Sequence, residues 1–310
     1  MSMGATLDLK EANRLVKRFA MPTRPTVILE AVKLQNQFVA DPEQVRATIM
    51  GDIALLAQVL QAANSRVVGH ERRVESLQSA IVLLGHDRLR EATQDLFLTA
   101  DMARRESWTQ RLRVKSVRAA FLAAWMAEQV AVRAPHCMGG QLPLVAADEA
   151  YVAGMLHDCG QLVLLRHFED YPQLLAVETR PLGVSLEMAE MERYQLTHAL
   201  LSALLCELWQ LPKALVYTIE GHHQTDAFAG RPIKERKHMV LHAILLLTEW
   251  AEGDLSEWEW SRHQGYIERM LGWTEVEVQQ LHQEAQHWLT TVPWGREESI
   301  QVAQLGRSGG

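Results

Sequence analysis

The chain has 310 residues, of which 48% are hydrophobic and 22% charged, a composition typical of a globular protein and not of a disordered one. Its 31 basic and 38 acidic residues give a formal net charge of −7, which argues against nucleic acid as a partner because binding to the phosphate backbone needs a basic surface. Three cysteines without CxxC spacing predict no disulfide framework, and therefore a reducing, cytoplasmic location. We expect no membrane association, because the apolar runs are much shorter than a membrane span and no signal peptide is recognisable.

Apolar residues recur at helical spacing along the chain. Helices are predicted over residues 7–19, 27–38, 42–50, 53–64, 74–84, 87–102, 109–133, 148–157, 161–168, 185–193, 197–209, 212–221, 236–252 and 274–290. Asp41 and Pro42 supply the N-cap and first position of one helix, and Gly85 ends another. Because no turn dipeptide is flanked by alternating apolar residues, the sequence predicts an all-α protein.

Composition divides the chain into four parts. We expect an N-terminal helix in 1–20 and a helical domain in 21–225, which combines an N-terminal helical subdomain (21–102) with a core (108–225) that contains clustered His and Asp residues. A C-terminal helical extension follows in 226–292. Six of the nine tryptophans lie after residue 249, so this extension is expected to pack or bind through large aromatic faces. Residues 293–310 are predicted to be a flexible tail.

The sharpest local motif is the run Gly154-Met155-Leu156-His157-Asp158-Cys159-Gly160. Neighbouring residues on a helix point about 100° apart, so His157 and Asp158 can reach one ion only if the helix ends there. We expect Gly160 to permit that turn. An imidazole and a carboxylate together suit a divalent transition metal, whose bound water can attack a phosphate ester. A helix-capping Asp beside a hydrogen-bonded His is the competing interpretation of the same dipeptide.

Two further helix ends carry histidine. His198 is predicted in the first turn of a helix capped by Thr197, where the helix dipole disfavours a cation and keeps the imidazole neutral. His222 and His223 end another apolar helix. A structural role is the alternative for each. The remaining histidines in polar or loop contexts are predicted to be solvated, namely His70, His86, His136, His167, His263, His282 and His287.

At this point the chain resembles the HDOD domains, relatives of the HD and HD-GYP phosphohydrolases. The resemblance runs from about Met21 to Gln224 and rests on short motifs in a fixed order: MPTRP at 21–25, LQAANS at 60–65, SLQSAIVLLG at 76–85, AGMLHDCG at 153–160, His198, WQLP at 209–212 and GHH at 221–223. It implies an all-helical HDOD architecture with an N-terminal helical subdomain and a core like that of the HD phosphohydrolases. Such domains serve mostly as output or scaffolding modules in bacterial signalling.

The resemblance also implies which metal ligands are missing. The position of the first histidine ligand of HD enzymes corresponds to Lys115, and that of the later aspartate to Ile244; a residue that is often Lys in active relatives is Gln161. An ammonium repels a dication and an aliphatic chain offers no lone pair, so ordinary HD hydrolysis is not expected. His242 could replace the acid only in a shifted helix register.

Two alternatives remain for the partial set His157, Asp158, His198, His222 and His223. It binds a single divalent metal (Fe, Mn, Zn or Ni), or it forms a hydrogen-bonded polar cluster in which Lys115 replaces the ion and pairs with Asp158.

Three functions follow from these alternatives. The first is a non-catalytic bacterial signalling module that contacts a partner protein and can form a homodimer. The second is a metal-dependent phosphohydrolase or phosphodiesterase acting on a nucleotide or cyclic dinucleotide. The third is binding of a nucleotide second messenger without cleavage, for which Lys115, Arg118 and Arg111 are the candidate cations.

Overall fold

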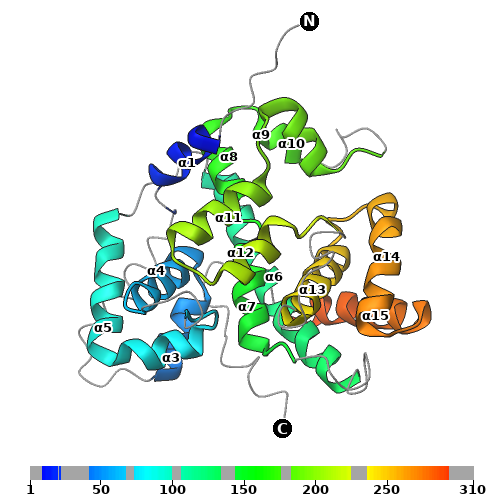
Figure 1. The fold of residues 1–310 in the computed structure, drawn as a ribbon, viewed down its shortest axis with the longest axis horizontal. Helices are drawn as coiled ribbons and strands as arrows, with labels where there is room; N and C mark the ends of the chain where they lie inside the picture. Colours follow the sequence, from blue (N-terminus) through cyan, green and yellow to red (C-terminus); the bar gives the residue numbers. More distant parts are fainter. Residues whose placement is uncertain are drawn as a thin grey trace, which may run out of the picture.

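The computed structural model of the chain describes residues 9–19, 21, 42–67, 73–99, 106–133, 144–175, 183–224 and 236–292. Helices and short connections make up these residues, and none of them belongs to a strand, so the prediction of an all-α fold is confirmed (Figure 1). The predicted helix over 27–38 and the predicted tail over 293–310 lie outside the described residues.

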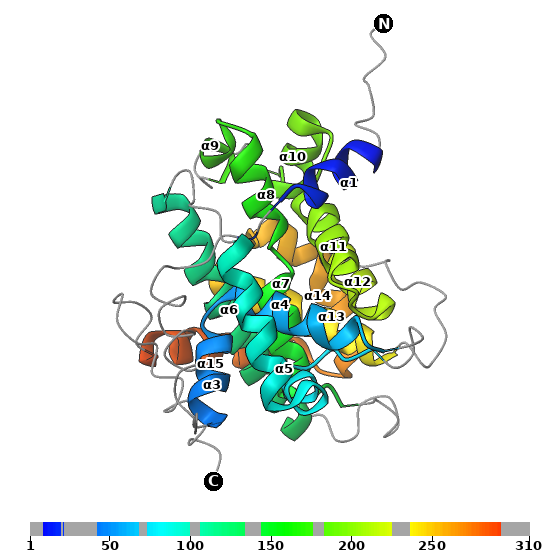
Figure 2. The ribbon, with the colours of Figure 1, turned by 90° about the vertical axis from the view of Figure 1, so that its left-hand side faces the viewer.

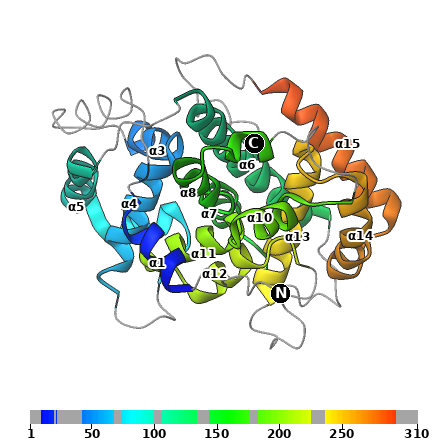
Figure 3. The ribbon, with the colours of Figure 1, turned by 90° about the horizontal axis from the view of Figure 1, so that it is seen from above.

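The helices follow one another in this order: α1 (Leu9–Lys17), α3 (Pro42–Met50), α4 (Ile53–Asn64), α5 (Leu77–Thr99), α6 (Glu106–Arg133), α7 (Ala147–Leu156), α8 (Gly160–His167), α9 (Tyr171–Leu175), α10 (Leu186–Tyr194), α11 (His198–Leu208), α12 (Lys213–Glu220), α13 (Arg236–Glu252), α14 (Glu257–Leu271) and α15 (Glu275–Thr291). Two of them, α9 and α14, are absent from the sequence prediction. The two helices predicted on either side of Gly85 are both present within α5, because Gly85 interrupts its helical geometry with a φ of 66° and a ψ of 176°. From above, α3–α5, then α6–α8 with α11 and α12, and then α13–α15 lie side by side (Figure 3).

The N-terminal unit is built around α4, which is buried along most of its length. Asp52 caps this helix by accepting hydrogen bonds from the backbone N–H groups of Ala54 and Leu55. Helices α3 and α5 flank α4, and the three lie in front of α6 and α7 when the protein is viewed from the side of α5 (Figure 2). Tyr151 of α7 donates a hydrogen bond to the carbonyl of Met50, which ties this unit to the centre.

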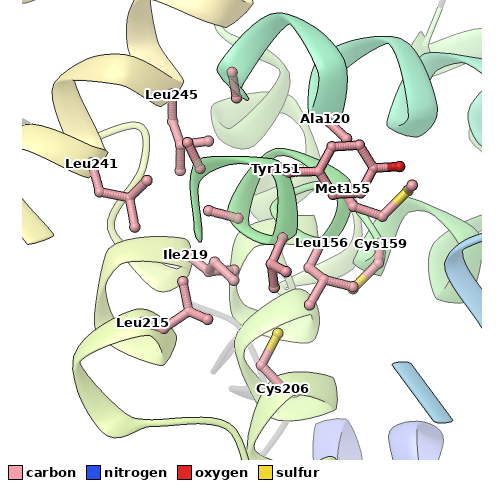
Figure 4. Close-up of a cluster of buried hydrophobic side chains, with 14 of the residues drawn as sticks. Ala120, Tyr151, Met155, Leu156, Cys159, Cys206, Leu215, Ile219, Leu241 and Leu245 are labelled. Carbon is pink, nitrogen blue, oxygen red and sulfur yellow. The ribbon is translucent and has the colours of Figure 1, made fainter. Parts of the chain in front are cut away.

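The centre of the fold is the pair α6 and α7. Their close approach depends on Gly154, where an added Cβ would lie 2.7 Å from the carbonyl oxygen of Ala119. The apolar core continues from this pair to α11, α12 and α13 through side chains that include Met155, Ile219 and Leu245 (Figure 4). The polar residues at the ends of α7, α11 and α12 are thereby placed around one point.

Gly160 performs a different task from the one predicted. It begins α8 without a positive φ, and an added Cβ would lie 2.2 Å from the carbonyl oxygen of His198 and 2.7 Å from the N atom of Ser202. Its backbone N–H donates to Ser202 Oγ at 2.8 Å. The glycine therefore permits contact between α8 and α11 and does not provide a left-handed turn.

Aromatic packing joins the C-terminal helices. Trp250 of α13 is stacked between Trp260 of α14 and His282 of α15, with both ring-centroid distances 3.5 Å. His263 is buried in α14. The prediction that His263 and His282 are solvated is therefore wrong, because His263 is buried and the half-buried His282 stacks on Trp250. Among the described residues, no helix is long and apolar enough to cross a membrane.

Candidate functional site

Four helices bring the candidate polar side chains to one buried point. His157 and Asp158 follow the last residue of α7, His198 begins α11, and His222 and His223 follow α12. Lys115 comes from the middle of α6. The structure thus brings together all five residues that the sequence selects as metal candidates, together with Lys115.

His157 and His222 present lone pairs to this point. The Nδ1–H of His157 donates to the carbonyl of Gly154 at 2.9 Å, and that of His222 donates to the carbonyl of Ile219 at 2.6 Å. Each Nε2 is therefore deprotonated in the neutral ring, and each lies buried without a hydrogen-bond partner. Burial lowers the pKa of both imidazoles, which keeps the two rings neutral.

Lys115 forms a close ion pair with Asp158. Its Nζ lies 2.7 Å from Asp158 Oδ2 and 3.2 Å from Oδ2 of Asp254. Although burial acts to raise the pKa of Asp158, Lys115, His157 and His198 together outweigh it and hold that pKa well below its usual value. The pair is one of the two arrangements that the sequence analysis leaves open.

The surroundings of His198 favour its charged form, contrary to the prediction from the helix dipole. Its Nδ1 lies 2.7 Å from Glu190 Oε2, which also accepts from its backbone N–H, and its Nε2 lies 3.2 Å from Asp158 Oδ1. Burial opposes protonation, but Glu190 and Asp158 raise the pKa of His198 well above its usual value. Glu190 is fully buried on α10 and accepts a further hydrogen bond from Tyr171 at 2.6 Å. Glu190 is therefore the residue that orients His198.

Glu249 of α13 is the site carboxylate that sequence reasoning missed. Its Oε1 lies 3.4 Å from His222 Nε2 and 3.7 Å from His157 Nε2. Burial raises the pKa of Glu249 well above its usual value, and the charges of Asp158 and Asp254 raise it further. Ile244, the position expected for the later acid, packs in the apolar core. The available signal was the carboxylate itself, which is the one acidic residue in the mostly apolar stretch 240–251.

His242 does not reach the site. Its Nε2 donates to the carbonyl of Gly221 at 2.9 Å, and its Nδ1 lies 3.0 Å from the hydroxyl of Tyr266. Burial lowers the pKa of His242 to about 4, consistent with a neutral structural ring.

His223 lies at the edge of the cluster. Its Nε2 is 2.9 Å from His198 Nε2, and its Nδ1 is 3.6 Å from Glu249 Oε2. With 16% of its side chain exposed, it is the most accessible of the five candidate residues. His198, His222 and His223 form a second group whose ring nitrogens are close enough for one ion.

The cations proposed for nucleotide binding have other partners. Arg118 Nε donates to Glu252 Oε1 at 2.6 Å, and Lys115 lies between Asp158 and Asp254. Burial and Asp254 raise the pKa of Glu252 to about 7. Arg111 lies over the ring of Trp108, 4.9 Å from its centroid. Among the residues that the structure describes, the surroundings of the site are rich in carboxylates and do not form a pocket of unpaired positive charge.

The chemical capacity of the site follows from its donors. His157, Asp158, His222 and Glu249 each offer one ligand atom, and these four atoms all lie within 4.8 Å of one another. Two imidazole nitrogens and two carboxylate oxygens suit Zn²⁺, Fe²⁺ or Mn²⁺. The donors fit a divalent metal; a hydrolytic site would also need access for water and substrate.

The described part of the chain is an all-helical fold in which adjacent His and Asp residues end a core helix. The sequence pattern of the HDOD domain matches residues 21–225, about two thirds of the chain. The chain therefore belongs to the HDOD domain family.

The individual proteins that resemble this chain share little of its sequence. The MmoQ response regulator of Methylococcus capsulatus has a similar fold, with a TM-score of 0.58 and 21% identity over 86% of this chain and 98% of that one. A virulence factor of Campylobacter jejuni gives a TM-score of 0.55 and 17% identity, covering 91% of this chain and 98% of its own. An uncharacterised protein of Treponema pallidum is 23% identical over 218 residues, which is 66% of this chain but only 37% of that protein.

Proposed function

We propose that this protein is a signalling module that acts by contacting a partner protein, and that its HD-type site does not hydrolyse a substrate. One observation carries the proposal: the ligand atoms are enclosed. His157, Asp158, His222 and Glu249 are at most 5% exposed. A metal-bound water attacks a phosphate ester only where the ester can approach it, and the low exposure of these four described residues argues against such an approach.

The ion pair of Lys115 supports the same conclusion. In the family resemblance this position carries the first histidine ligand, whereas here an ammonium lies 2.7 Å from Asp158. An ammonium has no lone pair to give to a metal. The fold is also shared with a protein named as a response regulator, which is consistent with a role in signalling.

Phosphohydrolase activity is the second candidate, because the structure adds Glu249 to the retained His157, Asp158 and His222. Phosphodiesterase assays distinguish the non-catalytic signalling role from phosphohydrolase activity. They use cyclic dinucleotides and nucleotides as substrates, in the presence of Fe²⁺, Mn²⁺, Zn²⁺ or Ni²⁺. We expect no sustained turnover. Turnover that is lost in His157→Ala and kept in His242→Ala, a matched buried histidine outside the site, would show that the protein is an enzyme.

Binding of a nucleotide second messenger receives less support, because Lys115 and Arg118 are both neutralised by carboxylates. The cytoplasmic location, the homodimer and the identity of the protein partner stay predictions.

A further inference from the structure

A surface groove lies between the C-terminal half of α6 and the second half of α15, two helices that pack against each other. Its volume is about 580 Å³, and it is lined by Trp125, Gln283, Glu284, His287, Trp288 and Thr291. We infer that this tryptophan groove is the surface through which the protein contacts its partner, and that it binds a basic segment of that partner by placing an arginine or lysine side chain against the two indoles. The inference rests on the proposed signalling role, because it names the chemistry of the partner that such a role requires.

The first argument is the aromatic lining. Trp125 of α6 and Trp288 of α15 are stacked, with ring centroids 5.7 Å apart and an angle of 23° between the rings. Both side chains pack against the core but are only partly buried, and both line the groove. The face of an indole ring is the negative end of its quadrupole, and tryptophan attracts cations more strongly than tyrosine or phenylalanine does. A groove of this size, lined by two indoles, therefore suits the flat guanidinium or the ammonium of a partner residue.

The second argument is the polar lining. Glu284 supplies a carboxylate, and its hydrogen bond with Arg133 lowers the pKa of Glu284, so this group is ionised at neutral pH. Gln283 and Thr291 add side-chain oxygens that can accept hydrogen bonds. Helix α15 ends at Thr291, and its last turn carries no basic residue. Because the C-terminal end of a helix carries partial negative charge, the end of α15 also favours a cation in the groove.

The third argument is that the chain makes the same kinds of contact within itself. The guanidinium of Arg133, at the end of α6, forms an ion pair with Glu284 at the rim of the groove. Glu284 also accepts a hydrogen bond from Gln280 at 3.0 Å, but a carboxylate offers about four lone pairs, which leaves room for a further donor. On the neighbouring helix α14, Arg262 lies over the ring of Trp258, 5.1 Å from its centroid. A carboxylate beside indole faces is thus an arrangement that arginine side chains already use in this fold.

The fourth argument is the charge of the helices around the groove. Residues 257–291, which span α14 and α15, contain 6 acidic and 2 basic residues, a balance of 2 − 6 = −4 out of −7 for the whole chain. Such a surface speeds the approach of a basic partner and repels an acidic one. A second copy of the chain is disfavoured as the occupant, because a symmetric dimer through this groove would bring the same acidic helices together.

The experiment measures binding of a defined probe to the full-length chain. The probe is a fluorescein-labelled nine-residue peptide with three arginines spaced by Gly-Ser pairs, and the comparison peptide carries citrulline, an uncharged analogue, in place of each arginine. Fluorescence anisotropy at pH 7 and about 0.1 M salt gives the two affinities. We expect the arginine peptide to bind at least about 10-fold more tightly, and to protect residues 283–292 and the C-terminal half of α6 from hydrogen exchange.

Variants of the groove test where the peptide binds. Trp125→Ala and Trp288→Ala should each weaken binding by about 3- to 30-fold, the range that corresponds to the loss of one cation–π contact. The matched control is Trp258→Ala, which removes an exposed indole outside the groove and should leave the affinity unchanged. Circular dichroism checks that each variant is helical.

A charge variant avoids any change to the packed indoles. His287→Lys places an ammonium in the groove at an exposed position and should weaken binding of the arginine peptide by about 5-fold, because like charges a few ångströms apart repel by about 1 kcal/mol even in water. Val276→Lys makes the same change in net charge at an exposed position three turns earlier on α15, and should have a smaller effect because salt screens charges more than about 10 Å apart.

The inference is overturned if the citrulline peptide binds as tightly as the arginine peptide, or if the groove variants behave like their controls. It is also overturned if sedimentation shows a dimer that His287→Lys dissociates, which would assign the groove to a second copy. The same holds if residues after 292 are protected from hydrogen exchange in the free chain and lose that protection in Trp288→Ala, which would assign it to the chain's own C-terminal segment. Each of these results leaves the signalling role standing, whereas turnover in the phosphodiesterase assays would remove that role without affecting peptide binding.

Discussion

Lys115→Met tests whether the ammonium of Lys115 stabilises the buried carboxylates around it. Methionine keeps an unbranched stem of similar length but carries no charge. The variant leaves Asp158 and Asp254 without the cation that lies 2.7 and 3.2 Å from their Oδ2 atoms. Asp158 is 5% exposed, so water cannot replace the lost partner there.

The magnitude follows from the two distances. At an effective dielectric constant of about 20, the attractions are about 6 kcal/mol to Asp158 and about 5 kcal/mol to Asp254. The second is reduced by solvent, because a third of the Asp254 side chain is exposed. Desolvation of the ammonium offsets several kcal/mol of the remainder, so we expect Lys115→Met to lower the free energy of unfolding by about 3–5 kcal/mol.

Guanidinium chloride denaturation at pH 7, with chelator present in every sample, measures this loss. The double variant Lys115→Met/Asp158→Asn should recover part of it, because no buried charge is then left unpaired; we expect a coupling energy of about 2 kcal/mol or more. A loss below about 1 kcal/mol, or additive effects of the two substitutions, would refute the interpretation of Lys115 as the internal counterion of Asp158.

Three further predictions concern the scaffold. Gly160→Ala should destabilise the protein by about 3 kcal/mol in chemical denaturation, because its Cβ would meet backbone atoms of α11. The control is Gly265→Ala in α14, which should be neutral or stabilising because the nearest atom is the flexible end of Arg269 at 3.3 Å. Equal losses of stability in the two variants would contradict this prediction. Hydrogen bonds to Lys237 and His238 lower the pKa of Glu75 to about 2, although burial opposes this shift. The ionised carboxylate therefore contributes at most about 3 kcal/mol to stability. This contribution is complete above about pH 4.5 and disappears as the pH falls toward 2. The stability difference between the natural chain and Glu75→Gln should shrink over that range, and a constant difference would disprove the ion pair. Ser256→Ala removes the N-cap of α14 and should cost about 0.5–2 kcal/mol by thermal unfolding, whereas Ser261→Ala, inside the same helix, should have a smaller effect.

Helix ends were the best-predicted part of the site. Caps, glycines and histidines in the sequence located the ends of α7, α11 and α12, and these ends do converge. The position of the acid was missed because Ile244 and Glu249 are five residues apart, which turns the side chain by about 140° on a helix. Only the packing of α13 determines which of the two faces the site.

Two other differences have physical causes. The predicted neutral His198 rested on a helix dipole worth about 0.3–1 kcal/mol, whereas a carboxylate 2.7 Å away exerts several times that energy. The sequence does not show that Glu190 lies beside His198, because the turn between α10 and α11 brings the two side chains together only in the folded chain. Helix α14 was missed because its buried stripe of Trp260, His263 and Tyr266 combines large aromatic and polar rings, which apolar periodicity does not register.

Helix α13 connects parts of the protein that are otherwise far apart in the chain. Lys237 near its start pairs with Glu75 of the N-terminal unit and with Glu149 of α7. Near its end, Glu249 faces the site and the next residue, Trp250, is stacked between α14 and α15. Neighbouring side chains on a helix are rigidly separated by about 100°, so rotating α13 to repack Trp250 necessarily moves the Glu249 carboxylate. Helix α13 thus contributes residues to both the C-terminal aromatic stack and the buried site, so a rotation of this helix would displace both.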